Sequence, residues 1–304
     1  MKQPYLGIAL KVSATLAFSI MSACIKLAGP VPVGEVIFFR CIFALVPLFA
    51  LSVYTVGPRA VVQTSKPWLH VIRSTIGISS MFMGFSAIKM LPLADATAYS
   101  FVMPIFVVVL ASLMLRETVG PVRGAAVVIG FAGVVLMTQA HGGLTAIIEA
   151  GFSAGSGLAL TGAFLSAFVV IFIRQMSNSE RSETIVFYFM TVSAVVSGIT
   201  MIWEHVMPTP LVAFWLVMSG LLGGVGQICM TYSYRFAEPS MLAPFDYVAM
   251  VWAMALGFLI FGDVPAAVML AGAGVVIAAG LFIVWREREM HREDLLVDPV
   301  QVDS

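Results

Sequence analysis

Long apolar runs alternate with short polar breaks along nearly the whole chain. A helix that crosses the hydrocarbon core of a bilayer needs about 20 apolar residues. Reading each run between proline, glycine or charged breaks predicts ten helical spans, near residues 6–28, 33–54, 68–90, 95–115, 121–138, 152–174, 184–203, 211–236, 240–261 and 264–285. We therefore expect an all-α integral membrane protein with short loops and a charged tail at 286–304.

The amino-acid composition also indicates an integral membrane protein. Hydrophobic residues make up 60% of the 304 positions and charged residues 11%, which leaves too little polar surface to coat a soluble globule. The 16 basic and 16 acidic residues cancel, so the net charge indicates no nucleic-acid partner. The three cysteines have neither disulfide nor metal spacing, and we expect no metal and no cofactor. The lipid bilayer is the expected surrounding.

The positions of Lys and Arg predict how the spans are oriented, because basic residues near span ends stay on the cytoplasmic side. With the N-terminus in the cytoplasm, most of the loop basic residues fall inside, whereas Lys26 and Lys89 fall outside. The prediction is a multi-pass protein of the bacterial inner (cytoplasmic) membrane with both termini cytoplasmic. The oligomeric state stays open, a homodimer included.

The two halves of the chain repeat one another. Trp68-Leu69 ahead of Pro92 recurs as Trp215-Leu216 ahead of Pro239, and the stretch starting at Glu35 echoes the one starting at Glu183. Each half holds five spans, and because five is odd the second copy must enter the membrane the other way up. We expect a first repeat over 1–141, a second over 152–285 and a cytoplasmic tail over 286–304.

Several short motifs resemble the EamA repeats of the drug/metabolite transporter superfamily. They are Leu93-Ala94-Asp95-Ala96 through Pro104 and Ile129-Gly130-Phe131-Ala132-Gly133 in the first half, and Ala243-Pro244-Phe245-Asp246-Tyr247 and Phe261-Gly262-Asp263-Val264-Pro265 in the second. The resemblance covers residues 5–285. It implies two inverted five-helix repeats, a central cavity between them and alternating access by rocking. It fixes neither substrate nor direction.

Ionisable residues inside spans are costly and are functional candidates by default. Arg40 lies about 10 Å into the second span at 1.5 Å per residue. One hypothesis is that it contacts an anionic group of the substrate. The alternative is a structural partner, either Glu35 or a backbone carbonyl. Arg73 lies nearer the cytoplasmic end of the third span, so its alternative is snorkelling to the headgroups. For Lys11 we expect snorkelling to the inner surface.

Asp246 is the acid of most interest, because it lies within the ninth span just after Pro244. A buried carboxylate that gains and loses a proton near neutrality would couple transport to the proton gradient. The alternative is a fixed acceptor that braces Tyr232 or Tyr234.

Aromatic residues concentrate in the spans that line the cavity in look-alikes, and they are candidates to stack on a planar substrate. The candidate set is Tyr99, Phe101, Tyr232, Tyr247 and Trp252. Pro92, Pro104, Pro239 and Pro244 are expected to break or bend spans and to contribute to gating. Gly220-x-x-x-Gly224 predicts a close approach between helices.

The leading hypothesis is a secondary transporter of a small organic metabolite, with uptake of a planar heterocycle such as riboflavin as the substrate hypothesis. The alternative is export of amino acids or related metabolites, with Arg40 at the carboxylate. The chain contains no nucleotide-binding motif, so ATP hydrolysis is not expected. Gly151-Phe152-Ser153-Ala154-Gly155 matches a hydrolase pattern but opens an apolar span, and His70, His141, His205 and His291 are dispersed, so the chain is not expected to be an enzyme.

Overall fold

The computed structural model describes residues 3–90, 100, 102–116, 120–138 and 154–262, together with 267–285 except 269, 273, 276, 280, 283 and 284. Pro92, Tyr99, Phe101 and the tail at 286–304 therefore lie outside the described residues. The described elements are all helical: α1 (Pro4–Ala28), α2 (Val33–Thr55), α3 (Pro58–Val61), α4 (Pro67–Met90), α6 (Met103–Leu115), α7 (Pro121–Thr138), α9 (Ala154–Met176), α10 (Ser182–Thr200), α11 (Pro210–Phe236), α12 (Pro239–Leu242), η2 (Ala243–Tyr247), α13 (Val248–Leu256) and η3 (Gly257–Phe261).

These helices follow the predicted spans closely. Within the described ranges six helices are long and apolar enough to cross a membrane: α1, α2, α9, α10, α11 and the run from α12 to η3. The 24-residue helix α4 is as long as several of these, and α6 and α7 include shorter apolar segments. The all-α membrane class is confirmed, and the count of ten spans is confirmed in part.

Local sequence explains where the helices start. Pro210 opens α11 at a position where its missing N–H has no helical partner to lose. Thr209 caps the same helix, because its side-chain oxygen accepts a hydrogen bond from the N–H of Val212 at 3.4 Å.

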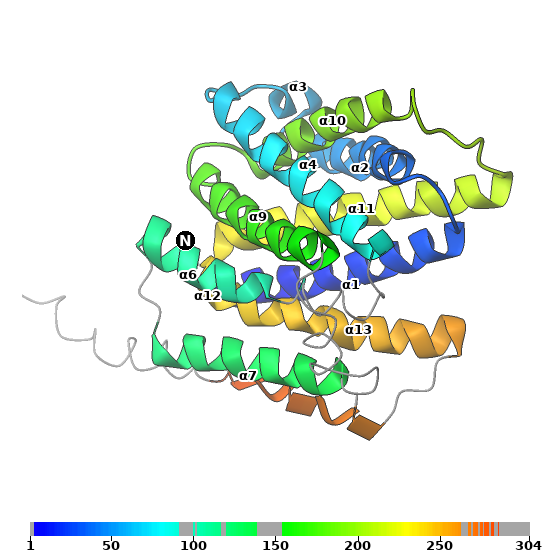
Figure 1. The fold of residues 1–304 in the computed structure, drawn as a ribbon. Helices are drawn as coiled ribbons and strands as arrows, with labels where there is room; N and C mark the ends of the chain where they lie inside the picture. Colours follow the sequence, from blue (N-terminus) through cyan, green and yellow to red (C-terminus); the bar gives the residue numbers. More distant parts are fainter. Residues whose placement is uncertain are drawn as a thin grey trace, which may run out of the picture.

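Helix contacts obey the two-fold relation expected of inverted repeats. The first span α1 packs against α11, and its counterpart α9 packs against α4 (Figure 1). The helix α2 contacts α11, and the equivalent helix α10 contacts α4. The helices α2 and α10 also contact each other. The repeats are therefore interleaved rather than set side by side, and residues of both repeats meet in the middle of the bundle.

The glycine motif of α11 produces the expected close packing. A Cβ added at Gly220 would lie 2.5 Å from the Cβ of Phe43, and one added at Gly224 would lie 2.7 Å from the Cα of Ala44. The backbones of α11 and α2 thus approach each other without side chains between them, as small residues allow in membrane helices.

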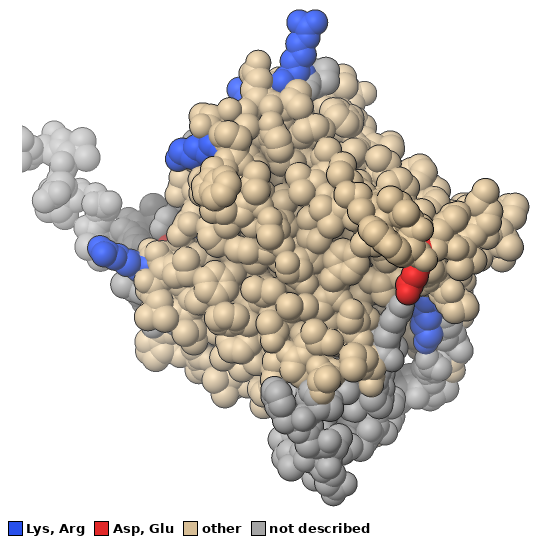
Figure 2. Space-filling view, turned by 45° about the horizontal axis from the view of Figure 1, so that its top comes forward, with Lys and Arg blue, Asp and Glu red and all other residues tan. Residues whose placement is uncertain are grey.

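The surface of the bundle suits lipid. Figure 2 shows a face that is almost wholly uncharged, with the few visible Lys, Arg, Asp and Glu side chains at its edges. Large apolar side chains such as Val53, Leu113, Val128 and Leu259 are between 64% and 75% exposed. Exposed apolar area of this kind is expected where the solvent is hydrocarbon.

Candidate functional site

Lys11, Asp246 and Tyr234 form a charged cluster inside the bundle. The Nζ atom of Lys11 on α1 lies 2.7 Å from Oδ1 of Asp246 in η2 and donates a hydrogen bond of 2.7 Å to the hydroxyl of Tyr234 on α11. The ammonium group also lies 4.9 Å from the centre of the Tyr234 ring. The side chain of Lys11 is 2% exposed and that of Asp246 is 17% exposed. The cluster joins one residue of the first repeat to two of the second.

The break in the ninth span positions Asp246. Pro239 starts the four-residue helix α12, and the chain then continues through the 3-10 segment η2, which contains Pro244, before the regular helix α13 begins. Proline removes one backbone donor and clashes with the preceding turn, and a 3-10 segment is a common result of such interruption. The third break residue described, Pro104, lies buried in the first turn of α6.

The expectation for Lys11 is wrong. Its side chain does not reach the inner surface but turns inward, because Asp246 and Tyr234 supply a carboxylate and a hydroxyl within 2.7 Å. A buried ammonium with such partners avoids the cost of an isolated charge. One feature of the sequence indicates a buried role for Lys11, namely a cation within an apolar span. Its partners, however, lie more than two hundred residues away along the chain.

Arg40 and Arg73 are both buried, at 8% and 1% exposed. Arg40 is not paired with Glu35, whose carboxylate instead accepts the N–H of Val206 at 3.1 Å and lies 3.6 Å from His205. The Nη1 atom of Arg40 lies 3.5 Å from the sulfur of Met81 on α4. The alternative of snorkelling is wrong for Arg73, because its guanidinium packs 3.5 Å from the centre of the Phe189 ring inside the bundle.

The described aromatic candidates lie in two separate places. Tyr232 on α11 donates a hydrogen bond of 2.6 Å to Glu183 at the start of α10. Trp252 on α13 donates to Thr15 on α1 at 3.2 Å, and the ring of Tyr247 packs against Gly130 of α7. Trp252 and Tyr247 of the ninth span therefore contact α1 and α7, whereas Tyr232 of α11 lies beside the start of α10.

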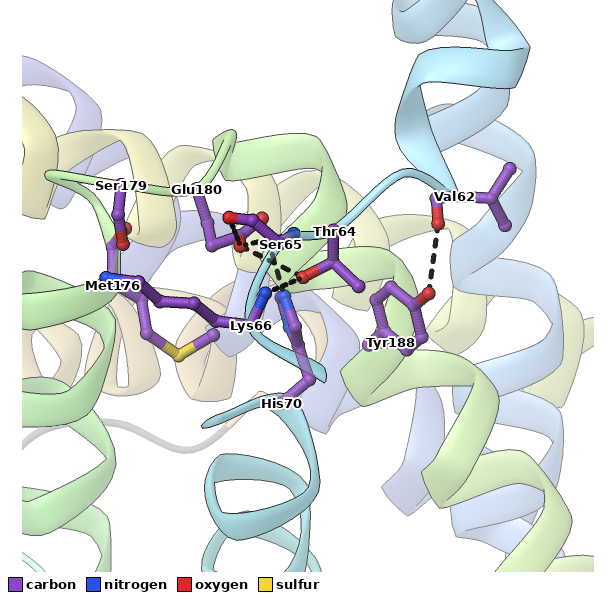
Figure 3. Close-up of polar contacts among 9 residues, drawn as sticks. All are labelled: Val62, Thr64, Ser65, Lys66, His70, Met176, Ser179, Glu180 and Tyr188. Atoms are coloured by element: carbon purple, nitrogen blue, oxygen red, sulfur yellow. Dashed lines mark hydrogen bonds and ion pairs between the residues drawn. The ribbon is translucent and has the colours of Figure 1, made fainter. Parts of the chain in front are cut away.

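A second polar cluster, which the sequence did not indicate, ties two loops together around Glu180 (Figure 3). The carboxylate of Glu180 accepts hydrogen bonds from Thr64 at 2.9 Å and from the N–H and hydroxyl of Ser65 at 3.1 Å, and His70 lies 3.7 Å away. Burial raises the pKa of this carboxyl, but the hydrogen bonds from Thr64 and Ser65 outweigh that effect and hold the pKa below its ordinary value. This cluster clamps the α3–α4 loop of the first repeat to the α9–α10 loop of the second.

No group of three or more His, Cys, Asp and Glu side chains able to hold a metal ion occurs within the described part of the chain. The chemistry present is that of a buried ion pair and hydrogen-bond donors at a helix break between the two halves of the chain. Such an arrangement is typical of secondary transporters, in which broken helices supply the substrate site near the bilayer midplane.

The family model for the EamA-like transporter family matches residues 5–139 and again 153–285. The chain belongs to this family, part of the drug/metabolite transporter superfamily, and it is a transporter rather than an enzyme.

Relatives with assigned substrates match over most of their length. The chain is 29% identical to a riboflavin transporter of Rhizobium johnstonii, over 93% of this chain and 91% of the relative. It is 27% identical to a pseudopaline exporter of Pseudomonas aeruginosa, over 90% and 94% of the two chains. An S-adenosylmethionine uptake transporter of Rickettsia prowazekii is 27% identical over 84% of each chain.

A protein of known crystal structure shares the fold with a TM-score of 0.81 at 18% identity, over 95% of this chain and 99% of that one. That likeness shows the fold alone. The named relatives include both uptake transporters and an exporter, and their substrates differ.

Proposed function

We propose that this chain carries a small planar metabolite across the bacterial cytoplasmic membrane by alternating access, with riboflavin as the first molecule to test and uptake as the direction. The Lys11–Asp246 pair supports this proposal most directly, because it is a buried ion pair that joins the two repeats at a helix break. Similarity to a riboflavin transporter supports the choice of riboflavin. The basic loop residues favour cytoplasmic termini.

The ion pair would act as the coupling element. In the described conformation Lys11 stabilises the carboxylate form of Asp246. The side chain of Asp246 is 17% exposed, so a proton can reach its carboxylate. Protonation neutralises Asp246 and removes the attraction that holds α1 to η2. The repeats can then rock apart on that side, and loss of the proton on the other side restores the pair. Proton binding and the change of access would in this way be linked.

Transport is tested by accumulation of radiolabelled riboflavin in a vitamin-auxotrophic bacterial host that expresses the chain. We expect uptake above the vector control that saturates with riboflavin concentration. Accumulation equal to that of the vector control would exclude the riboflavin substrate.

Alternating access is tested separately by cross-linking the repeats. The hydroxyl of Ser19 on α1 donates to the carbonyl of Ala249 on α13 at 3.4 Å, so Ser19→Cys and Ala249→Cys put one thiol on each of two helices that are in contact. In a background without Cys24, Cys41 and Cys229, oxidation should stop flux and reduction should restore it. Flux that continues after complete cross-linking would indicate a channel instead.

The second candidate function is export of an amino acid or a related metabolite. It is favoured by Arg40, a buried guanidinium whose Nη1 contacts the sulfur of Met81 and whose Nε has no hydrogen-bond partner among the described residues. Inverted vesicles incubated with radiolabelled amino acids separate the two candidates, because an exporter of amino acids accumulates them in the vesicle lumen.

A further inference from the structure

Three side chains in the bundle carry hydrogen-bond donors that remain unused. The Nε atom of Arg40, all three guanidinium nitrogens of Arg73 and the side-chain nitrogen of Gln227 are fully enclosed and have no hydrogen-bond partner among the described residues. Gln227 is 2% exposed. A buried donor without an acceptor is costly, and a buried charge without one costs more.

The two arginines reach the same stretch of α4. A Cβ added at Gly77 would lie 3.3 Å from Nη1 of Arg73, so this side chain extends along α4 toward the following turn. Met81, which receives Nη1 of Arg40 at 3.5 Å, lies one helical turn beyond Gly77. The two guanidinium groups are within electrostatic reach of each other and of the Cys41 thiol.

The helix α11 borders the same place. A Cβ added at Gly223 would lie 3.4 Å from Nε of Arg40, so the bare backbone of α11 leaves room for this guanidinium. Gln227 follows Gly223 by one turn and shares its face of α11. Side chains with unused N–H donors on α2, α4 and α11 thus border one region of the bundle, and the aromatic rings of Phe18 and Phe189 lie over the two cations.

The second repeat has no cation at the positions that match these two arginines. Arg40 follows Glu35 at the same spacing as Tyr188 follows Glu183, and Arg73 follows Trp68 as Gly220 follows Trp215. Each arginine lies in a costly position and occurs in only one copy of the duplicated unit. The two arginines therefore indicate a function that the second repeat does not share.

We propose that Arg40, Arg73 and Gln227 form a site for an oxyanion, namely a carboxylate or phosphate group of the transported metabolite. Guanidinium groups offer paired N–H donors that match the two oxygens of either anion. The inference rests on the proposed transport function and narrows it. Riboflavin has no anionic group at neutral pH, so a flat substrate that also fills this site carries an added carboxylate or phosphate.

The first test needs no substrate. Thermal unfolding of the purified full-length protein is compared for wild type, Arg40→Met, Arg73→Met and the control Arg59→Met, whose arginine is exposed on α3. Removing an uncompensated buried charge should raise the unfolding midpoint by about 2–4 °C, whereas the control should stay near wild type. A lower midpoint in both buried-site variants would show that these arginines already stabilise the folded protein without an anion, and would overturn the inference.

The second test measures anion binding directly. Unfolding midpoints are recorded with sodium acetate or sodium phosphate and compared with sodium chloride at equal ionic strength. Ligands of the folded state raise the midpoint, so we expect acetate, phosphate or both to stabilise wild type and Arg59→Met but neither Arg40→Met nor Arg73→Met. The anion that acts distinguishes a carboxylate site from a phosphate site. Equal midpoints in all three salts, or equal stabilisation of all variants, would overturn the inference.

Neither measurement depends on flux. If the protein binds the anion but transports nothing, the oxyanion site is supported and the proposed transport function is excluded. If transport is saturable but no anion binds, the transport function is supported and the oxyanion site is excluded.

Discussion

Lys11 and Asp246 form an ion pair of 2.7 Å between helices that belong to different repeats. The pair lies where the ninth span is interrupted by η2, so Asp246 sits on a 3-10 segment and not on a regular α-helix. Tyr234 holds Lys11 from a third helix through its hydroxyl group. This cluster is where a change of charge would most directly change the contact between the repeats.

The first prediction concerns the energy of this pair. Asp246→Asn leaves the ammonium of Lys11 buried with only neutral partners, so the free energy of unfolding should fall by about 3–5 kcal/mol. Combining it with Lys11→Met should recover part of that loss, because no buried charge remains uncompensated. Denaturation in detergent measures both, with Lys66→Met at an exposed position as the control. Additive effects of the two substitutions would contradict the pairing.

The second prediction concerns Glu183, a buried carboxylate in the first turn of α10. Glu183 accepts hydrogen bonds from Tyr232 at 2.6 Å and from Thr55 at 3.0 Å. Tyr232→Phe should lower the free energy of unfolding by about 1.5–3 kcal/mol, because a hydrogen bond to a charged group is lost. Tyr188→Phe, which removes a bond to the carbonyl of Val62, should cost less. Equal losses in the two variants would show that Glu183 is not an important acceptor.

The extent of the spans was predictable from the sequence, whereas the partners of the charged residues were not. Apolar run length is a local property, so helices such as α2 and α11 begin and end within a residue or two of the prediction. The pairing of Lys11 with Asp246 depends on how α1 docks against the second repeat, and no local pattern encodes that contact. Snorkelling was a fair expectation for Arg73 by depth alone, but its side chain points deeper into the bundle.

The third prediction follows from the lowered pKa of Glu180. A carboxyl whose folded-state pKa is depressed stabilises the folded state above its ordinary pKa of 4.5, and this contribution disappears as the pH falls through the lower folded value. Glu180→Gln should therefore be less stable than wild type near neutral pH, and the difference should shrink in acid. Unfolding midpoints across pH test this, with the exposed Glu204→Gln as control. A gap that widens in acid would contradict the cluster of Figure 3.

The fourth prediction concerns the contact of α11 with α2. Gly224→Ala places a methyl group 2.7 Å from the Cα and carbonyl oxygen of Ala44, where only backbone movement makes room. We expect a loss of about 1–3 kcal/mol in unfolding free energy. At Gly84 in α4 an added Cβ meets no atom within 4 Å, so Gly84→Ala should be neutral or stabilising through helix propensity. Comparable tolerance at both glycines would contradict the close packing.

The proton-coupling role of Asp246 has its most direct test in the pH dependence of flux. Purified wild type and Asp246→Asn are reconstituted in liposomes, and riboflavin uptake is followed from about pH 5.5 to about pH 8, a range that a coupling carboxyl has to titrate. We expect wild-type flux to change with pH and the variant to lose that dependence while still inserting into the membrane. A variant with the same pH profile as wild type would contradict the account.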